Sequence, residues 1–367
     1  MDVLVTGISR NLGARLAARL AEHPEIGRVV GVDTMPPNEE LQAILGDRVE
    51  VITGDIRTVM ATVATRDAET VVHLGVMSTP GRAGRAAMKE YNIIGTMQLL
   101  AACQAAPGLR KVVVRSSTAA YGASFRDPAV FTESMPPTLM PRGGFAKDII
   151  EIEGYVRGFA RRRPDVTTTV LRFAPFLGAT ADTTLTRLFS LPVVPTVFGR
   201  DPRLQFVHMD DALEVLTRAV VEDHPGTFNV AGPGVLLLSQ AVRRAGRIGL
   251  PVVEFGMSAF AGFVRASRLG LDFTHDQLDL FVHGRVVDVS RLIEEFGFTP
   301  RSTEEVFAEF VAARSHRTAG GLPAVRPDAL LAYESQILDG IRAVRAAAGA
   351  GVNALRSTAA LMKNGLR

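Results

Sequence analysis

The segment that follows the first apolar run has the residues needed to hold a phosphate group. Gly7 would let the backbone turn sharply after a strand, and Gly13 would let the next helix pack closely against that strand. The free N–H groups at the start of such a helix favour an anion. Arg10 and Asn11 replace the middle glycine of the usual dinucleotide fingerprint, so the turn alone does not identify a nucleotide site. We expect a pyrophosphate to be held by Gly7, Arg10, Asn11, Leu12 and Gly13.

An acidic residue stands where the ribose of a bound nucleotide would lie. Asp33 follows the second apolar run, 20 residues after Gly13. Its carboxylate can accept hydrogen bonds from both ribose hydroxyls and would repel a 2′-phosphate, which favours NAD over NADP. Arg10 acts in the opposite direction, because a guanidinium could pair with that phosphate, but we give Asp33 more weight. Asp55 and Ile56, after the third apolar run, are expected at the adenine, although Asp55 could instead cap a helix.

Short apolar runs alternate with helical patterns through the first half of the chain. The runs lie at residues 3–5, 29–32, 49–52, 71–74, 112–115 and 168–171. They are continuous rather than alternating in polarity, as in a parallel sheet that is covered on both faces. Helical spacing is found at residues 12–20, 92–106 and 148–161. We therefore predict a doubly wound α/β fold, with an NAD-binding domain over residues 1–175.

The second half of the chain is less regular and is divided by prolines. We expect residues 176–317 to form a smaller substrate-binding lobe, with strands near residues 205–230 that return to the main sheet. The strands are predicted at residues 205–208 and 227–230, and helices at residues 239–248 and 258–269. A strand end followed by a helix is predicted over residues 286–298.

Composition and charge exclude several classes of protein. A hydrophobic content of 47% is far from that of a disordered chain, and a net charge of +3 is too small to indicate nucleic-acid binding. The single cysteine, Cys103, cannot form an internal disulfide, and the seven histidines show no metal-ligand spacing, so we expect no metal. The first residues do not resemble a signal peptide, and no apolar run reaches the ~20 residues of a membrane span. We expect a cytoplasmic protein.

Residues 318–367 form a tail that differs from the rest of the chain. A glycine-proline linker near residue 320 precedes helical spacing, and from residue 341 onward there are five cationic residues and no acidic one. A basic amphipathic helix of this kind could pack on its own protein or on a second subunit, and we favour such a packing role. We also expect the protein to be a homodimer. Peripheral contact with a membrane surface and a disordered tail are the alternatives.

Several motifs, taken in order, resemble the extended branch of the short-chain dehydrogenase/reductase superfamily, the NAD-dependent epimerases and dehydratases typified by UDP-galactose 4-epimerase. These motifs lie at residues 6–13, 33, 54–56, 71–75, 92–96, 116–122, 171–173 and 206–211. Together they cover about residues 1 to 315. The resemblance implies a nucleotide-binding fold of the Rossmann type and adds Leu74, Gly75 and Asn92 to the expected NAD contacts.

The resemblance also assigns catalytic positions. Ser117 would orient the reacting hydroxyl, and Lys147 would hold the nicotinamide ribose. The family's catalytic Tyr is expected four residues before that lysine, where this chain has Gly143. None of the four tyrosines in the chain lies four residues before a lysine. Tyr121, four residues after Ser117, is the nearest phenol in sequence and the candidate replacement.

The chain also differs from nucleotide-sugar enzymes of this family at positions that would contact the substrate. Pro175 and Leu204 stand where nucleotide-sugar enzymes have an asparagine and a diphosphate-binding arginine. We therefore expect a small-molecule substrate that is not a nucleotide sugar. The candidate substrate contacts are Met77, Ser78, Arg172, Arg203 and Arg285.

Two functions remain open on the sequence alone. The first is an NAD-dependent oxidoreductase or epimerase that acts on a hydroxyl-bearing small molecule through Ser117 and a proton carrier other than tyrosine. The second is a catalytically impaired NAD-binding sensor or scaffold, with the basic tail as its partner-binding element.

Overall fold

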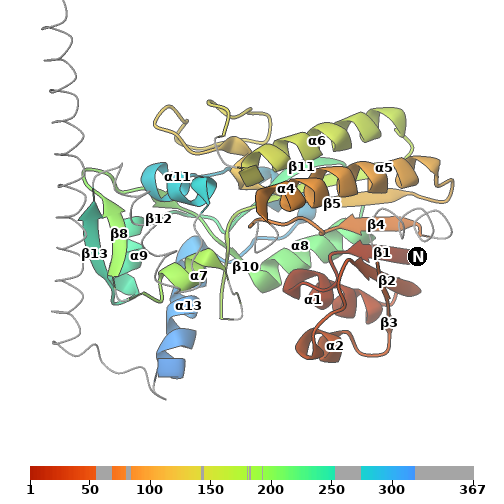
Figure 1. Ribbon diagram of the computed structural model, residues 1–367, viewed down its shortest axis with the longest axis horizontal. Coiled ribbons are helices and arrows are strands. Elements are labelled where there is room, and N and C mark those ends of the chain that lie inside the picture. The colour runs from red at the N-terminus through yellow and green to blue at the C-terminus, as the bar shows by residue number, and fades with distance from the viewer. Residues whose placement is uncertain are drawn as a thin grey trace, which may run out of the picture. The chain divides into compact units, whose positions relative to one another are not determined.

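Seven parallel strands form the central sheet, in the order β11-β6-β5-β4-β1-β2-β3 (Figure 1). Their bounds are β1 Asp2–Thr6, β2 Arg28–Asp33, β3 Val49–Thr53, β4 Thr70–His73, β5 Lys111–Ser117, β6 Thr167–Phe173 and β11 Gly226–Val230. The doubly wound α/β fold predicted from the continuous apolar runs is confirmed. The computed structural model describes residues 1–54, 68–79, 84–141, 144–179, 181, 183–191, 193–252 and 274–318.

Helices cover both faces of this sheet, which explains why its strands are apolar throughout (Figure 1). One face carries α1 (Asn11–Ala21), α2 (Glu39–Leu45), α8 (Met209–Val221) and α12 (Ser290–Phe296). The other carries α4 (Gly84–Lys89), a π-helical turn η2 (Glu90–Ile94), α5 (Gly95–Ala105) and α6 (Gly144–Arg162). Alternate residues of each strand enter the two cores: Val113 of β5 packs on the first face, and Val112 and Val114 pack on the second.

A third apolar core lies beyond the carboxyl ends of the strands. It contains Phe189, Phe206, Phe307 and Phe310, whose rings contact one another. The elements around it are β7 (Phe176–Leu177), α7 (Thr184–Leu188), β8 (Val193–Val197), β9 (Arg203–Leu204), β10 (Val207–His208), β12 (Leu236–Leu237), α9 (Leu238–Arg244), β13 (Ile248–Val252), α11 (His275–His283) and α13 (Thr303–Thr318). This third core forms one compact unit with the sheet, over residues 1–314.

Two predicted boundaries in this region differ from the structure. The helix predicted over residues 239–248 ends at Arg244, because Gly246 adopts a φ of 64° and turns the chain into β13. Of the strand predicted over residues 205–208, only Val207–His208 forms a strand, β10, which pairs with β7; the preceding strand β9 ends at Leu204. The helix predicted over residues 258–269 and the basic tail from residue 319 onward lie outside the described residues. Within the described ranges, no helix is long and apolar enough to cross a membrane.

Candidate functional site

The strand order reverses at β1 and β4, which lie side by side in the sheet. From β1 the chain continues to β2 and β3 on one side, whereas β4 leads to β5, β6 and β11 on the other. Ligands of open α/β sheets bind in the crevice outside the carboxyl ends of the strands at such a switch point. Gly7, after β1, and Gly75, after β4, meet there. A Cβ on Gly7 would lie 2.9 Å from the Gly75 nitrogen, and Gly7 has a φ of +80°, so the turn has no room for a side chain.

The N-terminus of α1 opens toward this crevice and has no anionic partner among the described residues. Gly13 packs so closely on the turn that a Cβ would lie 2.1 Å from the Gly7 carbonyl oxygen. Arg10 occupies the N-cap position but supplies no side-chain cap, and the first turn of α1, which is described throughout, contains no acidic residue. The N–H groups of that turn are therefore available to an anion, and the helix dipole favours one.

The carboxylate of Asp33 lies beside the same turn and is nearly buried, with 5% exposure. It accepts hydrogen bonds from the backbone N–H of Ser9 at 3.1 Å and of Thr34 at 2.7 Å, and from the Tyr91 hydroxyl at 3.5 Å. Burial and the Asp33 charge raise the pKa of Tyr91 to about 12. Arg10 lies over the Tyr91 ring, 6.0 Å from its centroid. The structure thus brings the glycine turn, Arg10 and Asp33 together.

His73, at the end of β4, holds the two strand ends in place. Its Nδ1 lies 2.7 Å from the Thr6 hydroxyl and its Nε2 lies 2.9 Å from the Thr96 hydroxyl. Thr96 donates to the Asn92 carbonyl oxygen, so it can only accept from His73, which assigns the proton to Nε2. Burial, with a smaller effect of Arg115, lowers the pKa of His73 to about 4. His73 is therefore a neutral structural residue.

The free energy of unfolding is expected to depend on pH through His73. Unfolded histidine binds a proton below about pH 6.5, and the folded protein does not take it up until about pH 4, so stability is lost as the pH falls between these values. From pH 7 to pH 5, His73 is expected to lower the free energy of unfolding by about 2 kcal/mol. Urea unfolding of the wild type and of His73→Gln at both pH values measures this contribution. An equal pH dependence in the two proteins would contradict this assignment.

Asn92 connects the loop after β4 to α6. Within the π-helical turn η2, its side chain accepts from the Met77 N–H at 2.8 Å and donates to the Met77 carbonyl oxygen at 3.0 Å. It also donates to the buried carboxylate of Asp148 at 2.9 Å, which pairs with Arg85. Lys147, the next residue before Asp148 on α6, is exposed. The network fixes the loop over the crevice and the first turn of α6 that carries Lys147.

The second lobe also contacts the start of α6. Asp276, from α11, accepts a hydrogen bond from the Ala146 N–H at 3.1 Å, and burial raises the pKa of its carboxyl group. No sequence motif predicts that Asp276 or Asp148 lies at this site. Gly143, which precedes this turn, lies outside the described residues, as do Asp55 and Ile56.

Ser117 precedes the short 3-10 helix η3 (Thr118–Tyr121), and Tyr121 is its last residue. Ser117, the last residue of β5, is partly exposed, and its hydroxyl accepts from the Ala119 N–H at 3.1 Å. Tyr121 is buried, and its hydroxyl donates to Asn229 at 2.8 Å and accepts from Arg172 at 2.7 Å. The Tyr121 hydroxyl thus both donates and accepts a hydrogen bond within the protein. This engagement argues against the predicted role of Tyr121 as the replacement proton donor.

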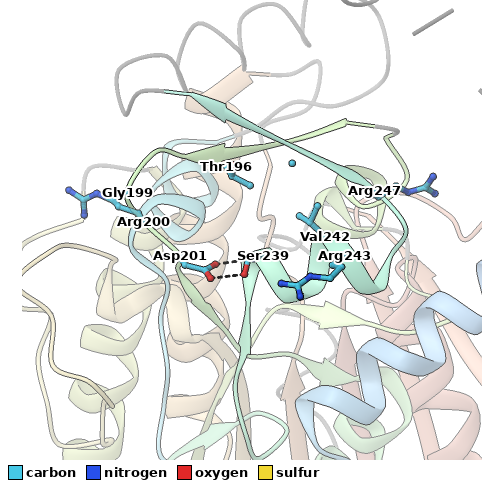
Figure 2. Close-up of a pocket in the computed structure, with 9 residues that line it drawn as sticks. Thr196, Gly199, Arg200, Asp201, Ser239, Val242, Arg243 and Arg247 are labelled. Carbon is cyan, nitrogen blue, oxygen red and sulfur yellow. Dashed lines mark hydrogen bonds between the residues drawn. The ribbon is translucent and has the colours of Figure 1, made fainter. Parts of the chain in front are cut away.

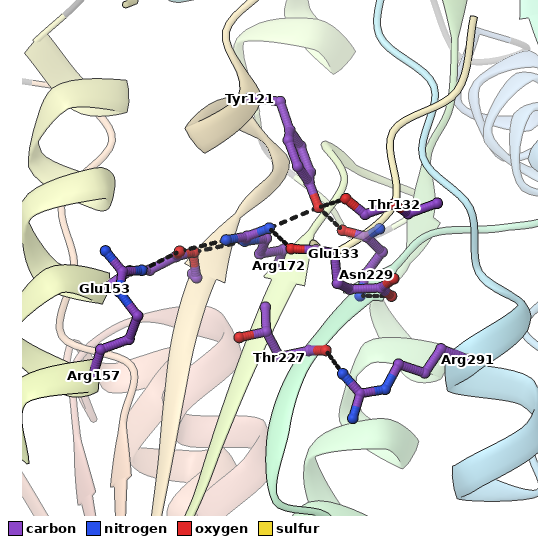
Figure 3. A network of polar contacts seen from close by, with 10 residues as sticks. Tyr121, Thr132, Glu133, Glu153, Arg157, Arg172, Thr227, Asn229 and Arg291 are labelled. Carbon is purple, nitrogen blue, oxygen red and sulfur yellow. Dashed lines mark hydrogen bonds and ion pairs between the residues drawn. The ribbon is translucent and has the colours of Figure 1, made fainter. Parts of the chain in front are cut away.

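Arg172 belongs to the same buried network, shown in Figure 3. Its guanidinium forms two hydrogen bonds to Glu153 of α6, at 2.8 and 2.6 Å, and both side chains are almost fully buried. Burial alone would lower the pKa of Arg172, but the bonds to Glu153 outweigh it and raise the pKa. The network ties β6 to α6, η3 and β11, which argues against the predicted contact of Arg172 with substrate.

The other predicted substrate residues are dispersed. Ser78 is exposed beside the crevice, and Met77 is held by Asn92. Arg203 and Arg285 line a separate pocket of about 310 Å³. Arg285 donates to the Gly122 carbonyl oxygen at 2.7 Å. Leu204 is buried, with 1% exposure, so the position expected to bind a diphosphate does not face solvent.

A larger pocket, of about 530 Å³, lies between α9 and the β8–β13 pair (Figure 2). Its lining includes Arg200, Arg243 and Arg247, and the carboxylate of Asp201, which accepts two hydrogen bonds from Ser239. In Figure 2 the side chains of Arg200 and Arg247 point away from this space. None of the residues predicted to bind cofactor or substrate lines this pocket.

Comparison with known proteins finds a family model that matches the part of the chain that forms the crevice. The model of the NAD dependent epimerase/dehydratase family matches residues 3–231, which include the glycine turn, Asp33, Asn92, Ser117 and Lys147. The chain belongs to this family. An uncharacterised protein of Mycobacterium tuberculosis strain H37Rv is 43% identical over 338 residues, which are 91% of this chain and 88% of that protein. An uncharacterised protein of Mycobacterium bovis matches to the same extent.

Solved structures show the same fold for this epimerase/dehydratase family member. MoeE5 in complex with UDP-glucuronic acid and NAD has a TM-score of 0.67 at 21% identity, covering 86% of this chain and 100% of MoeE5. The UDP-glucose 4-epimerase of Thermotoga maritima, solved with UDP-glucose, has a TM-score of 0.66 at 19% identity, covering 86% of this chain and 99% of that one. At these identities the likeness shows the fold alone.

Proposed function

We propose that the chain binds NAD in the crevice between β1 and β4 and acts as an oxidoreductase or epimerase on a hydroxyl-bearing small molecule. The observation that carries this proposal is the meeting of three features at the switch point: a turn without room for a side chain, an uncapped helix N-terminus, and the carboxylate of Asp33. Each feature matches one part of a dinucleotide. Membership of the NAD dependent epimerase/dehydratase family supports it.

The residues in the crevice fit NAD chemically. The Arg10 Nε is buried and has no hydrogen-bond partner among the described residues, so it is a donor free to meet a phosphate oxygen. The N–H groups of the first turn of α1 supply further donors. Asp33 accepts four hydrogen bonds from the protein, three of them at Oδ1. Its Oδ2 accepts only from the Ser9 N–H and keeps acceptor capacity for ribose hydroxyls.

Bound NAD would supply the hydride acceptor, and the chain would supply orientation. The Ser117 hydroxyl, partly exposed at the end of β5, would hold the reacting hydroxyl of the substrate. Lys147, exposed on the first turn of α6, would hold the nicotinamide ribose. With Gly143 in place of the family's tyrosine, the proton needs another carrier, because loss of a positioned acid or base costs about 10²- to 10⁴-fold in rate. Pro175 and Leu204 favour a substrate that is not a nucleotide sugar.

A second candidate function is an NAD-binding sensor or scaffold without turnover. It is favoured by the three described tyrosines, whose hydroxyls are all engaged: Tyr91 with Asp33, Tyr121 in the buried network, and Tyr155 with Glu151. The two functions differ in the chemistry of the bound cofactor. An enzyme should reduce its bound NAD with at least one alcohol of a substrate panel, whereas a sensor should leave it oxidised with all of them.

The wild type is expected to bind NAD at least about tenfold more tightly than NADP, because a 2′-phosphate beside the Asp33 carboxylate places like charges together. Asp33→Asn removes the charge and keeps the shape, so the preference for NAD should narrow. Asp47→Asn, which removes an equal charge from an exposed position after α2, is the matched control. Calorimetric titrations with both nucleotides measure the ratio, and equal wild-type affinities would contradict the assignment of Asp33.

A further inference from the structure

Among the described residues, Arg115 is a cation without an acidic partner, and it lies near the carboxyl end of β5, at the candidate site. It lies in β5, between the buried residues Val114 and Ser116, and its side chain is only partly exposed. Its Nη1 donates to the Val76 carbonyl oxygen at 3.1 Å, just beyond the end of β4. Its guanidinium also lies over the Phe176 ring, 5.8 Å from the centroid. Within the described part of the chain, no ion pair neutralises it.

The charges around Arg115 do not compensate for it either. Burial and the repulsion of Arg10 lower its pKa to about 10, so it is still a cation at neutral pH. Arg10 follows β1 on the other side of the switch point and also has no ion pair among the described residues. His73, the titratable group between them, is neutral above about pH 4. Arg10 therefore adds to the positive charge of Arg115 instead of offsetting it, and Arg115 makes the β4–β5 half of the crevice electropositive.

The register of β5 places Arg115 close to the reacting end of a dinucleotide. Side chains two residues apart lie on the same side of a strand and about 7 Å apart, so Arg115 and Ser117 share one side. With the adenosine half of the dinucleotide directed to Asp33 at the end of β2, the nicotinamide half must lie over β4 and β5. A hydroxyl held by Ser117 must meet the nicotinamide there, next to Arg115.

We propose that Arg115 makes the site select the reduced form of the cofactor. The proposal rests on the proposed binding of NAD in this crevice. The oxidised nicotinamide ring carries a positive charge and the reduced ring is neutral, so a nearby guanidinium disfavours only the oxidised form. A unit charge about 10 Å away, at an effective dielectric constant of about 20 to 40, changes a binding constant by roughly fivefold to fifteenfold. Arg115 thereby acts as a specificity-determining residue toward the redox state of the cofactor.

The test compares the affinities of NAD⁺, NADH and ADP-ribose for the full chain by calorimetric titration. The wild type should bind NADH more tightly than NAD⁺. Arg115→Gln, which keeps a donor for the Val76 carbonyl oxygen, should reduce this ratio by about fivefold to fifteenfold. Arg115→Lys keeps the charge and should keep most of the ratio. Arg110→Met removes an equal charge from an exposed position just before the same strand and should leave the ratio unchanged.

ADP-ribose separates this proposal from the proposed function, because it lacks the nicotinamide. Its affinity should change by less than about twofold in every variant, which also shows that each variant is folded. An unchanged ratio in Arg115→Gln would overturn the proposal while leaving NAD binding intact. Equal weakening of all three nucleotides would also overturn it, since Arg115 would then contact the diphosphate. Failure of the wild type to bind any of the three would refute the NAD site itself.

Discussion

Replacement of Arg172 with methionine is expected to lower the free energy of unfolding by about 3–5 kcal/mol. The substitution removes the cation that forms two hydrogen bonds to Glu153 and leaves that carboxylate at 5% side-chain exposure. It also removes the donor to the Tyr121 hydroxyl. Glu153 would keep a hydrogen bond from Ser116 and the longer contact with the exposed Arg157, but it would lose its buried cation. Loss of the cation that pairs with a buried carboxylate is among the few defects that cost this much in a single substitution.

The matched control for this prediction is Arg157→Met. Arg157 also approaches Glu153, at 3.6 Å, but its side chain is 61% exposed, so its loss should cost no more than about 1 kcal/mol. Both arginines are visible beside Glu153 in Figure 3. Urea unfolding of the wild type, Arg157→Met and Arg172→Met at pH 7 gives the loss in free energy of unfolding for each variant. Similar values for Arg157→Met and Arg172→Met would show that the buried network contributes little to stability.

Gly7→Ala is expected to weaken the binding of NAD by at least about 30-fold, which corresponds to about 2 kcal/mol. The φ of +80° alone strains a residue with a side chain by about 1–3 kcal/mol. In addition, the new methyl group would lie 2.9 Å from the Gly75 nitrogen, within backbone that cannot yield cheaply. The turn must therefore move, and with it the N–H groups that face the phosphates.

Gly46→Ala separates this steric effect from backbone strain. Gly46 also has a positive φ, of +60°, but a methyl group there would meet no atom within 4 Å, and the residue lies after α2. It should lose some stability through strain and keep its affinity for NAD within about twofold. Thermal unfolding and NAD titration of both variants provide the comparison. Unimpaired binding by Gly7→Ala would show that the turn does not contact the cofactor.

The parts of this fold that depend on local backbone chemistry could be predicted from the sequence. Continuous apolar runs predict the strands of a sheet covered on both faces, and Gly7, Gly13 and Asp33 mark the turn, the helix and the strand end around one crevice. These signals are local because each concerns one strand, one turn or one helix start. Boundaries in the second lobe are less predictable, since its elements are short and are held by contacts with distant residues.

The side-chain networks could not be predicted, because they join residues that are distant in sequence. Tyr121 and its partner Asn229 are 108 residues apart, and Ala146 and Asp276 are 130 apart. Tyr121 therefore seemed available to substrate on the basis of sequence spacing, whereas its hydroxyl is used within the core. Arg115 does leave a signal, a charged residue in the apolar run of residues 112–115, but its lack of an acidic partner among the described residues becomes visible only in three dimensions.

The central claim, that the β1–β4 crevice is an NAD site, is tested most directly by calorimetric titration of the full chain with NAD. The account predicts saturable binding of one NAD per chain, strongly reduced in Gly7→Ala and retained in Gly46→Ala. Absence of saturable binding at millimolar NAD, or binding that Gly7→Ala does not change, would contradict it.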